Sequence, residues 1–206
     1  MAVGYLKTYF TPGVLHAQQK YFGRAQTIAH PATRDPLGLE EAQFIRERDS
    51  FYIATVNADG WPYLQHRGGP SGFLHLLDAH TAAFADFRGN RQLLSTGNLA
   101  TDDRVALFLM DYAGRERLKI NGHARVLDAR DHADLADKLT PSALRSKVER
   151  LFVIDILSFD WNCPQYITPR YTVEQLEALM APSKARIAEL EAELERYRNN
   201  ESRKPQ

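Results

Sequence analysis

A loop-forming stretch with two arginines is the part of this sequence whose residue types most suggest ligand chemistry. It reads Ala85-Asp86-Phe87-Arg88-Gly89-Asn90-Arg91-Gln92. Apolar residues before it predict the end of a strand, and the pattern from Arg91 to Leu99 predicts a helix with Asn90 as its N-cap. Free N–H groups at a helix start suit a phosphate, and an arginine donates two hydrogen bonds to one at once. A capped helix with solvated arginines gives the same pattern.

A second arginine lies where a predicted strand meets two glycines, in Gln65-His66-Arg67-Gly68-Gly69. Side chains alternate along a strand, so Gln65 and Arg67 are expected on one face and His66 on the other. Glycine lets a ligand approach the backbone closely, which favours Arg67 as a ligand contact. The alternative is an arginine that keeps its charged end in water at the rim of the fold.

A third stretch gathers aromatic and amide groups, from Phe159 through Trp161, Asn162 and Gln165 to Ile167. Trp161 is a candidate to pack on a planar ring and Gln165 to hydrogen-bond it. Trp161 is also a candidate to close the end of the core. Cys163 is the single cysteine, which excludes an internal disulfide, and nothing near it favours a reactive thiolate.

Composition narrows the function classes. Lys plus Arg and Asp plus Glu total 26 each, so no general attraction to nucleic acid or anionic membranes is expected. No histidine or cysteine spacing predicts a metal site, and no phosphate-loop, dinucleotide or nucleophile-elbow motif occurs. We expect neither a signal peptide nor a membrane span, and therefore a cytoplasmic protein.

The elements that position these residues are mostly strands. They are expected at residues 51–56, 61–67, 73–77, 81–85, 104–110, 116–127 and 151–159. Helices are expected over 39–48, 91–99 and 131–150, the last with a break at Pro141. Six to seven antiparallel strands with an inserted helix predict a mainly β protein built as a small barrel. The predicted domains are a helical extension over 1–37, the barrel over 38–170 and a helix over 171–206.

Apolar residues in the last segment alternate four and three positions apart, which predicts a heptad seam. The seam consists of Leu176, Met180, Ser183, Ile187, Leu190, Leu194 and Tyr197. Pro182 is expected to kink or restart this helix. The pattern fits a coiled coil between subunits and an amphipathic helix on its own barrel equally well.

Four landmarks in their order and spacing resemble the pyridoxamine 5'-phosphate oxidase-like family, the FMN-binding split barrels. They are residues 54–63, Arg88-Gly89-Asn90-Arg91, residues 103–108 and Ile120-Asn121-Gly122-His123-Ala124. The resemblance covers about residues 44–127. The segment from Asn162 to Ile167 resembles an uncharacterised subgroup and extends the match to about Arg170.

The resemblance implies a homodimer with FMN in clefts between the subunits. Asn90, Arg91 and Gln92 would hold the FMN phosphate, and Ala85 and Asp86 would line the flavin. His66 and Arg67 lie on the strand that supplies further phosphate contacts. Arg117 would sit where the partner subunit reaches the flavin, and Trp161 and Gln165 would close the ring side.

The sequence departs from true pyridoxamine phosphate oxidases at two places. Gln92 stands where they carry a lysine, and the chain continues through Ile167-Thr168-Pro169-Arg170 where they have a substrate-binding segment with Arg and His. The resemblance therefore implies an FMN-dependent oxidoreductase acting on another small organic molecule. The alternatives are a flavin-binding module for storage or sensing and a deazaflavin-dependent reductase; haem is disfavoured, because His66 is the one histidine near the predicted cleft.

Overall fold

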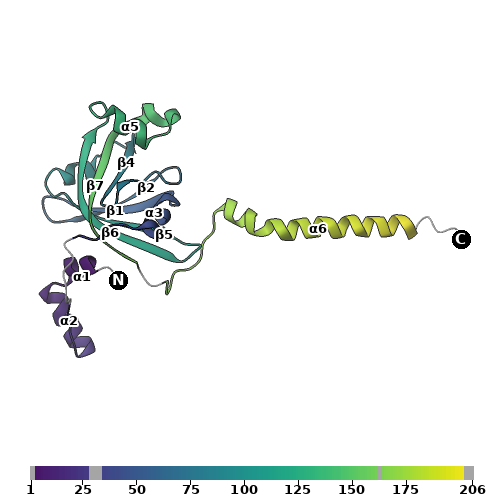
Figure 1. Cartoon of the computed structure of the whole chain (residues 1–206), viewed down its shortest axis with the longest axis horizontal. Helices are drawn as coiled ribbons and strands as arrows, with labels where there is room; N and C mark the ends of the chain where they lie inside the picture. Colours follow the sequence, from purple (N-terminus) through teal and green to yellow (C-terminus); the bar gives the residue numbers. More distant parts are fainter. Residues whose placement is uncertain (1–2, 28–33, 162–163, 202–206) are drawn as a thin grey trace. The chain divides into compact units, whose positions relative to one another are not determined.

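A computed structural model describes residues 3–27, 34–161 and 164–201. The chain divides into two compact units, one with residues up to Asp111 and from Arg115 to Ile167, the other with Tyr112–Gly114 and the chain from Thr168. The elements of the first unit are α1 (Val3–Tyr9), α2 (Pro12–Phe22), α3 (Leu39–Arg46), β1 (Ser50–Val56), β2 (Pro62–Gly68), β3 (His75–Asp78), β4 (Thr81–Phe87), α4 (Leu94–Leu99), β5 (Arg104–Asp111), β6 (Glu116–Asp128), α5 (Ala133–Leu139), a 3-10 helix (Ser142–Lys147) and β7 (Val148–Trp161) (Figure 1).

The described strands form one antiparallel sheet of seven strands, in the order β2-β1-β5-β6-β7-β4-β3. The sheet curls so strongly that strands from its two ends meet. Phe51 on β1 and Phe84 on β4 lie with ring centroids 5.3 Å apart, although three strands separate them in the sheet. This curling confirms the predicted small barrel of six to seven antiparallel strands with an inserted helix.

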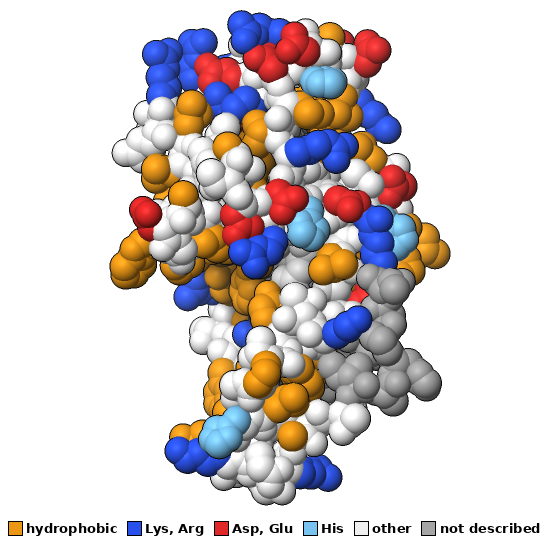
Figure 2. Space-filling model, turned by 90° about the vertical axis from the view of Figure 1, so that its left-hand side faces the viewer, with side chains coloured by type: hydrophobic (Ala, Val, Ile, Leu, Met, Phe, Trp, Pro, Cys, Tyr) orange, Lys and Arg blue, Asp and Glu red, His pale blue; other side chains and the backbone are white. Residues whose placement is uncertain are grey.

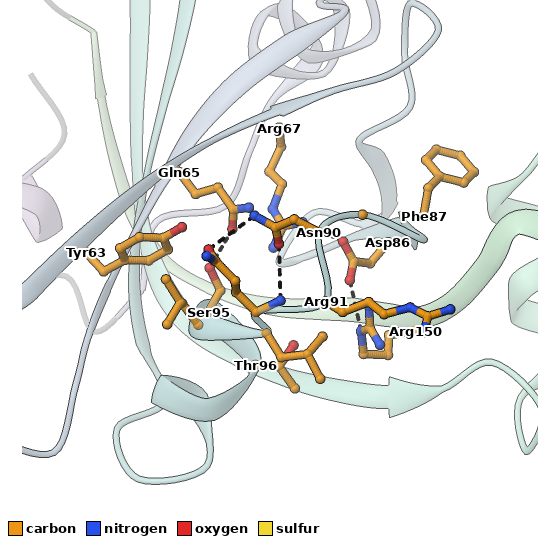
Figure 3. Close-up of a pocket in the computed structure, with 14 residues that line it drawn as sticks. Tyr63, Gln65, Arg67, Asp86, Phe87, Asn90, Arg91, Ser95, Thr96 and Arg150 are labelled. Carbon is orange, nitrogen blue, oxygen red and sulfur yellow. Dashed lines mark hydrogen bonds and ion pairs between the residues drawn. The ribbon is translucent and has the colours of Figure 1, made fainter.

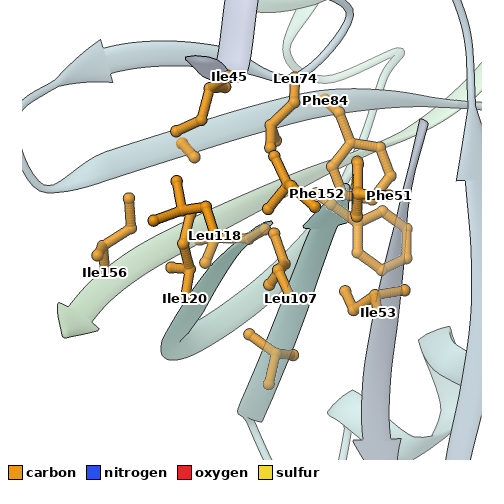
Figure 4. Close-up of a cluster of buried hydrophobic side chains, with 14 of the residues drawn as sticks. Ile45, Phe51, Ile53, Leu74, Phe84, Leu107, Leu118, Ile120, Phe152 and Ile156 are labelled. Atoms are coloured by element: carbon orange, nitrogen blue, oxygen red, sulfur yellow. The ribbon is translucent and has the colours of Figure 1, made fainter. Parts of the chain in front are cut away.

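The inside of the curled sheet is the main hydrophobic core. Buried aromatic and branched side chains from β1, β4, β5, β6 and β7 interdigitate there, with Ile45 of α3 closing one side (Figure 4). Phe84 stacks on Phe152 with centroids 4.8 Å apart and meets Phe51 edge-on. Burial of apolar area on this scale supplies most of the drive to fold.

A second, smaller cluster covers the outer face of β4 and β7. Ala83 and Ala85 of β4 pack there with Ala136 and Leu139 of α5. Because β4 is covered on both faces, every residue from Ala82 to Asp86 is buried. The small alanine side chains let α5 approach the sheet closely.

The predicted helix over residues 131–150 is wrong in its second half. α5 ends at Leu139, Pro141 takes an extended backbone with ψ 139°, and only one 3-10 helix follows before β7 begins at Val148. The apolar run after Arg150 pairs with β4 and β6, and this pairing extends the strand backward to Val148. Long-range strand pairing here outweighs local helical spacing.

The second unit contains α6 (Val173–Glu201), a continuous helix of 29 residues. Pro182 lies inside it, so the helix does not restart there, and the predicted kink stays a prediction. Before the helix, the guanidinium of Arg170 lies 4.8 Å from the ring centroid of Tyr112. None of the helices in the described part of the chain combines the length and apolar character needed to cross a membrane.

Candidate ligand-binding site

An open cavity of about 220 Å³ lies where β2, the end of β4 and the start of α4 meet (Figure 3). Polar and charged side chains dominate its lining. The lining residues are Tyr63, Gln65, Arg67, Asp86, Phe87, Gly89, Asn90, Arg91, Gln92, Leu93, Leu94, Ser95, Thr96 and Arg150. Three arginines and one carboxylate among them make the cavity a site for an anion.

Asp86 is held between two of these arginines. Its Oδ1 lies 2.5 Å from Arg67 Nη1, and its Oδ2 lies 2.9 Å from Arg150 Nε. The three side chains are between 8% and 18% exposed, so water screens these ion pairs only weakly. Asp86 balances one of the two positive charges, and Glu149, whose Oε2 lies 3.1 Å from Arg150 Nη1, offsets part of the other.

Aromatic rings fix the orientation of Arg67. Its guanidinium carbon lies 5.1 Å from the ring centroid of Phe152 and 5.7 Å from that of Phe84. Within the described residues, its Nε is buried and has no hydrogen-bond partner. A buried unsatisfied donor is costly, so an acceptor bound in the cavity would relieve this cost.

The loop between β4 and α4 corrects the prediction for Asn90. α4 begins at Leu94, and Leu93 is its N-cap residue, so the helix predicted from Arg91 starts three residues late. Asn90 instead accepts a hydrogen bond from the backbone N–H of Gln92 at 3.2 Å and donates one to the Gln92 side chain at 3.1 Å. With six residues, α4 offers little helix dipole.

Two non-glycine residues of this loop have left-handed backbone conformations. Arg91 has φ 64° and Leu93 has φ 55°. Such conformations cost about 1 kcal/mol each and concentrate at ligand sites. Here they turn the exposed Arg91 side chain into the cavity lining while Arg88, three residues earlier, pairs with Glu149 outside it at 2.9 Å.

The wall opposite the loop is formed by β2 and α4. Tyr63, Gln65 and Arg67 share the partly buried face of β2. Ser95 Oγ donates to Gln65 Oε1 at 2.9 Å, which holds the amide in one orientation. The sequence reading missed Tyr63, Ser95 and Thr96, which carry no motif, and missed Arg150 because it fell at the end of the wrongly predicted helix.

Two predicted site residues lie on other faces of the same strands. His66 points to the opposite face of β2, where its ring meets Tyr52 edge-on at 5.5 Å. Ala85 points away from Asp86 and lines a separate apolar pocket with Leu139 and Pro141. The structure therefore gathers Arg67, Asp86, Asn90, Arg91 and Gln92 at one cavity and leaves His66 and Ala85 outside it.

The remaining predicted residues also lie away from this cavity. Trp161 ends β7, where its Nε1 donates to Glu41 Oε1 at 2.7 Å and its ring meets Phe44 edge-on at 4.8 Å. Gln165 is exposed in the segment after β7, and Arg117 lies near the start of β6. Asn162 and Cys163 lie outside the described residues. The flavin contacts predicted for Arg117, Trp161 and Gln165 stay predictions.

Charges elsewhere are mixed. Acidic and basic side chains are interspersed over the face shown in Figure 2. Across residues 3–27, 34–161 and 164–201, no group of three or more His, Cys, Asp or Glu side chains is arranged to hold a metal ion.

The donor set of the cavity fits the phosphate of FMN better than it fits the flavin ring. Three arginines line the cavity, and within the described residues the buried Nε of one of them, Arg67, has no partner, which suits a phosphate dianion. The cavity volume of about 220 Å³ is smaller than the ~300–1,000 Å³ of pockets that enclose drug-sized ligands. A flavin held here by its phosphate would need further surface to cover its ring.

The comparisons with known proteins match the barrel part of the chain. The sequence profile of the family described as pyridoxamine 5'-phosphate oxidase matches residues 39–155, more than half of the chain and the whole of the cavity lining. No curated protein matches significantly.

Solved structures resemble the barrel at low identity. A putative pyridoxamine 5'-phosphate oxidase from Lactobacillus delbrueckii is 19% identical with a TM-score of 0.47, covering 61% of this chain and 93% of its own. HupZ from Group A Streptococcus is 14% identical with a TM-score of 0.47 and coverage of 66% and 100%. An FMN-binding protein from Syntrophomonas wolfei is 13% identical with a TM-score of 0.43 and coverage of 61% and 86%. Likenesses this distant say nothing about substrate or activity.

Proposed function

The chain belongs to the pyridoxamine 5'-phosphate oxidase family, and from that premise we propose that it is an FMN-dependent oxidoreductase that anchors the flavin phosphate in the arginine-lined cavity. The observation that carries the proposal is that Arg67, Arg91 and Arg150 line one cavity, where the buried Nε of Arg67 has no partner among the residues that the structure describes. When bound, the flavin supplies hydride or electron transfer. The substrate is a small organic molecule other than pyridoxamine phosphate, as the departures in sequence suggest.

The protein's own residues bind and orient. Arg67 is held rigidly by Asp86 and two aromatic rings, so it offers its donors without a large loss of side-chain entropy. Arg91 is exposed on a short loop and closes on the phosphate from the solvent side. Asn90 and Gln92 hold the loop shape through their mutual hydrogen bonds.

The small cavity supports the proposal of a homodimer, for which the cytoplasm is the proposed location. A ring that extends beyond the cavity needs a second surface, and the partner subunit is the proposed source. Arg117, Trp161 and Gln165, which do not reach this cavity, would then act on the flavin held by the other subunit. His66 and Ala85 would support their strands without touching the cofactor.

The first experiment is an absorption spectrum of the purified protein, with mass spectrometry of whatever heat releases. FMN in the released fraction supports the proposal, and a deazaflavin would move the activity to a deazaflavin-dependent reductase. Flavin that is retained but reduced by no nicotinamide cofactor and turned over with no acceptor favours a storage or sensing module. A folded protein that cannot be reconstituted with any flavin overturns the proposal.

The phosphate assignment is tested with a matched pair of loop arginines. Arg91→Ala should weaken FMN binding about 10- to 100-fold, because a charge-assisted hydrogen bond contributes about 1.5–3 kcal/mol. The same variant should bind riboflavin, which lacks the phosphate, as wild type does. Arg88→Ala removes an equal charge that lies outside the cavity lining and should change FMN affinity less than about threefold. Flavin fluorescence quenching measures all five affinities; equal losses for FMN and riboflavin would contradict the assignment.

A further inference from the structure

The C-terminal helix carries a stripe of apolar side chains along one face. Every described residue from Tyr171 to Asn199 is exposed, including Ile187 at 55% and Leu190 at 44%. Helices of this kind gain most of their stability by packing an apolar face, and a long exposed stripe marks an interaction surface. The proposed flavin site does not involve α6, so its role is a separate question.

Heptad positions along the seam are regular. Met180, Ile187 and Leu194 occupy the a positions, and Leu176, Ser183, Leu190 and Tyr197 occupy the d positions. Pro182 falls at a c position, outside the seam. Three of the four f positions are alanine, Ala178, Ala185 and Ala192, and the fourth is Asn199, so no large apolar side chain lies on the outer face.

The charges that flank the seam complement a second copy of the same helix. When Ile187 faces the partner's Leu190 in an antiparallel pair, Arg186 faces the partner's Glu193 and Lys184 faces the partner's Glu191. Glu177 then faces the partner's Arg198. All six charged e and g residues of the helix thus meet opposite charges, and such pairs set partner choice and orientation in coiled coils.

A parallel pair in register satisfies fewer charges. In it Arg186 faces the partner's Glu191 and Glu193 faces the partner's Arg198, but Lys184 faces the partner's Leu179. The seam also places Ser183 against Ser183 in a parallel pair, whereas the antiparallel pair places it against Leu194. Arg186 already forms an ion pair with Glu189 of its own helix, at 2.9 Å, with both side chains more than 60% exposed. Such an exposed pair is too weak to keep Arg186 from pairing with the partner's Glu193.

We propose that α6 is a self-association element that pairs antiparallel with α6 of a second copy of this chain. The seam of one chain packs on the seam of the second chain, in the register that places Met180 opposite the partner's Tyr197. The helices overlap from Leu176 to Glu201 in this register. The interaction holds chains together independently of flavin.

Site-directed crosslinking in the full chain tests the pairing and its direction. The test uses two variants in a Cys163→Ser background, one with Met180→Cys and the other with Tyr197→Cys, each with a tag of a different size. The two chains are co-produced and then oxidised. We expect a mixed disulfide dimer and little crosslinking of either variant alone. Efficient self-crosslinking of each variant alone would overturn the antiparallel orientation, and no crosslink in any combination would overturn the pairing itself. Ala192→Cys, on the outer face, is the control and should not crosslink.

A charge swap provides a second test that does not disturb the apolar seam. Arg186→Glu should slow formation of the mixed disulfide about three- to tenfold, because two pairs of opposite charge become like-charged. The double variant Arg186→Glu with Glu193→Arg should restore the wild-type rate. In a parallel pair the double variant would instead place like charges at both contacts and slow crosslinking further, which would contradict the proposal. Circular dichroism checks that the helix persists, and flavin content, measured by absorbance, reports on the proposed flavin site separately.

Discussion

At the scale of single residues, Asp86 organises the cavity. It is the one carboxylate among the described lining residues, and it contacts both Arg67 and Arg150. A carboxylate between two poorly hydrated arginines lowers the cost of keeping both charges in place without a ligand. The arginines therefore stay positioned for an anion.

Replacing Asp86 tests this role. Asp86→Asn should lower the free energy of unfolding of the ligand-free protein by about 1–3 kcal/mol, because the largely buried Arg67 loses its counter-charge and Arg150 keeps only Glu149. Asp128→Asn removes a partner of the exposed Arg130, outside the cavity, and should lower stability less than Asp86→Asn does. Urea denaturation measures the stability of both variants. Equal effects would show that Asp86 does not stabilise the fold more than an exposed ion pair does.

The lowered pKa of His75 predicts that the stability of the fold depends on pH. Burial lowers the pKa of His75 below 6.5, the nearby charge of Lys138 acts in the same direction, and a hydrogen bond to Leu139 opposes both. The unfolded chain therefore binds a proton at a higher pH than the folded chain does. Stability falls as the pH drops below about 6.5 through the lowered pKa.

Substitution of His75 isolates its share of that dependence. Between pH 7.5 and 5.5, the His75→Gln variant should lose less unfolding free energy than wild type. His132→Gln, at an exposed histidine, should keep the wild-type dependence. Urea midpoints at the two pH values give the comparison, and an unchanged slope in His75→Gln would refute the assignment.

At the scale of elements, the loop between β4 and α4 stores backbone strain beside the cavity. Leu93, at φ 55°, precedes Leu94, the first residue of α4, and both are 45% exposed. The two leucines thus differ mainly in backbone conformation. They form a matched pair for measuring the strain.

Glycine at these two positions should have opposite effects. Leu93→Gly relieves the left-handed conformation and should leave stability unchanged or raise it by up to about 1 kcal/mol. Leu94→Gly introduces glycine into a helix and should lower stability by about 1 kcal/mol. Thermal unfolding of both variants makes the comparison; destabilisation of similar size would mean that Leu93 is not strained.

At the scale of the whole molecule, curling of the sheet creates the cavity. β2 and β4 lie far apart in the strand order, yet Arg67 and Asp86 form an ion pair across the gap. The cavity lies at the split between the two ends of the sheet. It is open to solvent on one side, where the proposed partner subunit would cover the flavin.

Such a cover would couple flavin binding to subunit association. If both subunits contact each flavin, the dimer binds FMN more tightly than the monomer does. FMN should therefore lower the dimer dissociation constant, and more contacts from the partner should lower it further. Sedimentation at a series of protein concentrations, with and without saturating FMN, measures the shift. Riboflavin should produce a smaller shift than FMN at equal concentration. Identical association with and without FMN would place the flavin within one subunit.

Local sequence patterns determined most of the elements. The alternation along residues 61–67 placed Gln65 and Arg67 on one face, and the structure confirms it. The strands over 51–56, 104–110 and 116–127 are also present close to their predicted bounds. These features follow from side-chain periodicity and turn residues, which act over a few positions.

Tertiary structure alone decided where strands pair and which side chains meet. Val148 to Arg150 are strand because β4 and β6 offer hydrogen-bond partners, against the local helical pattern. For the same reason Arg150 reaches Asp86, from a strand 64 residues away in sequence. The sequence by itself determined the residue types that line the cavity, the heptad pattern and the family. The cavity itself required the curled sheet, because its walls come from segments whose contact no local pattern encodes.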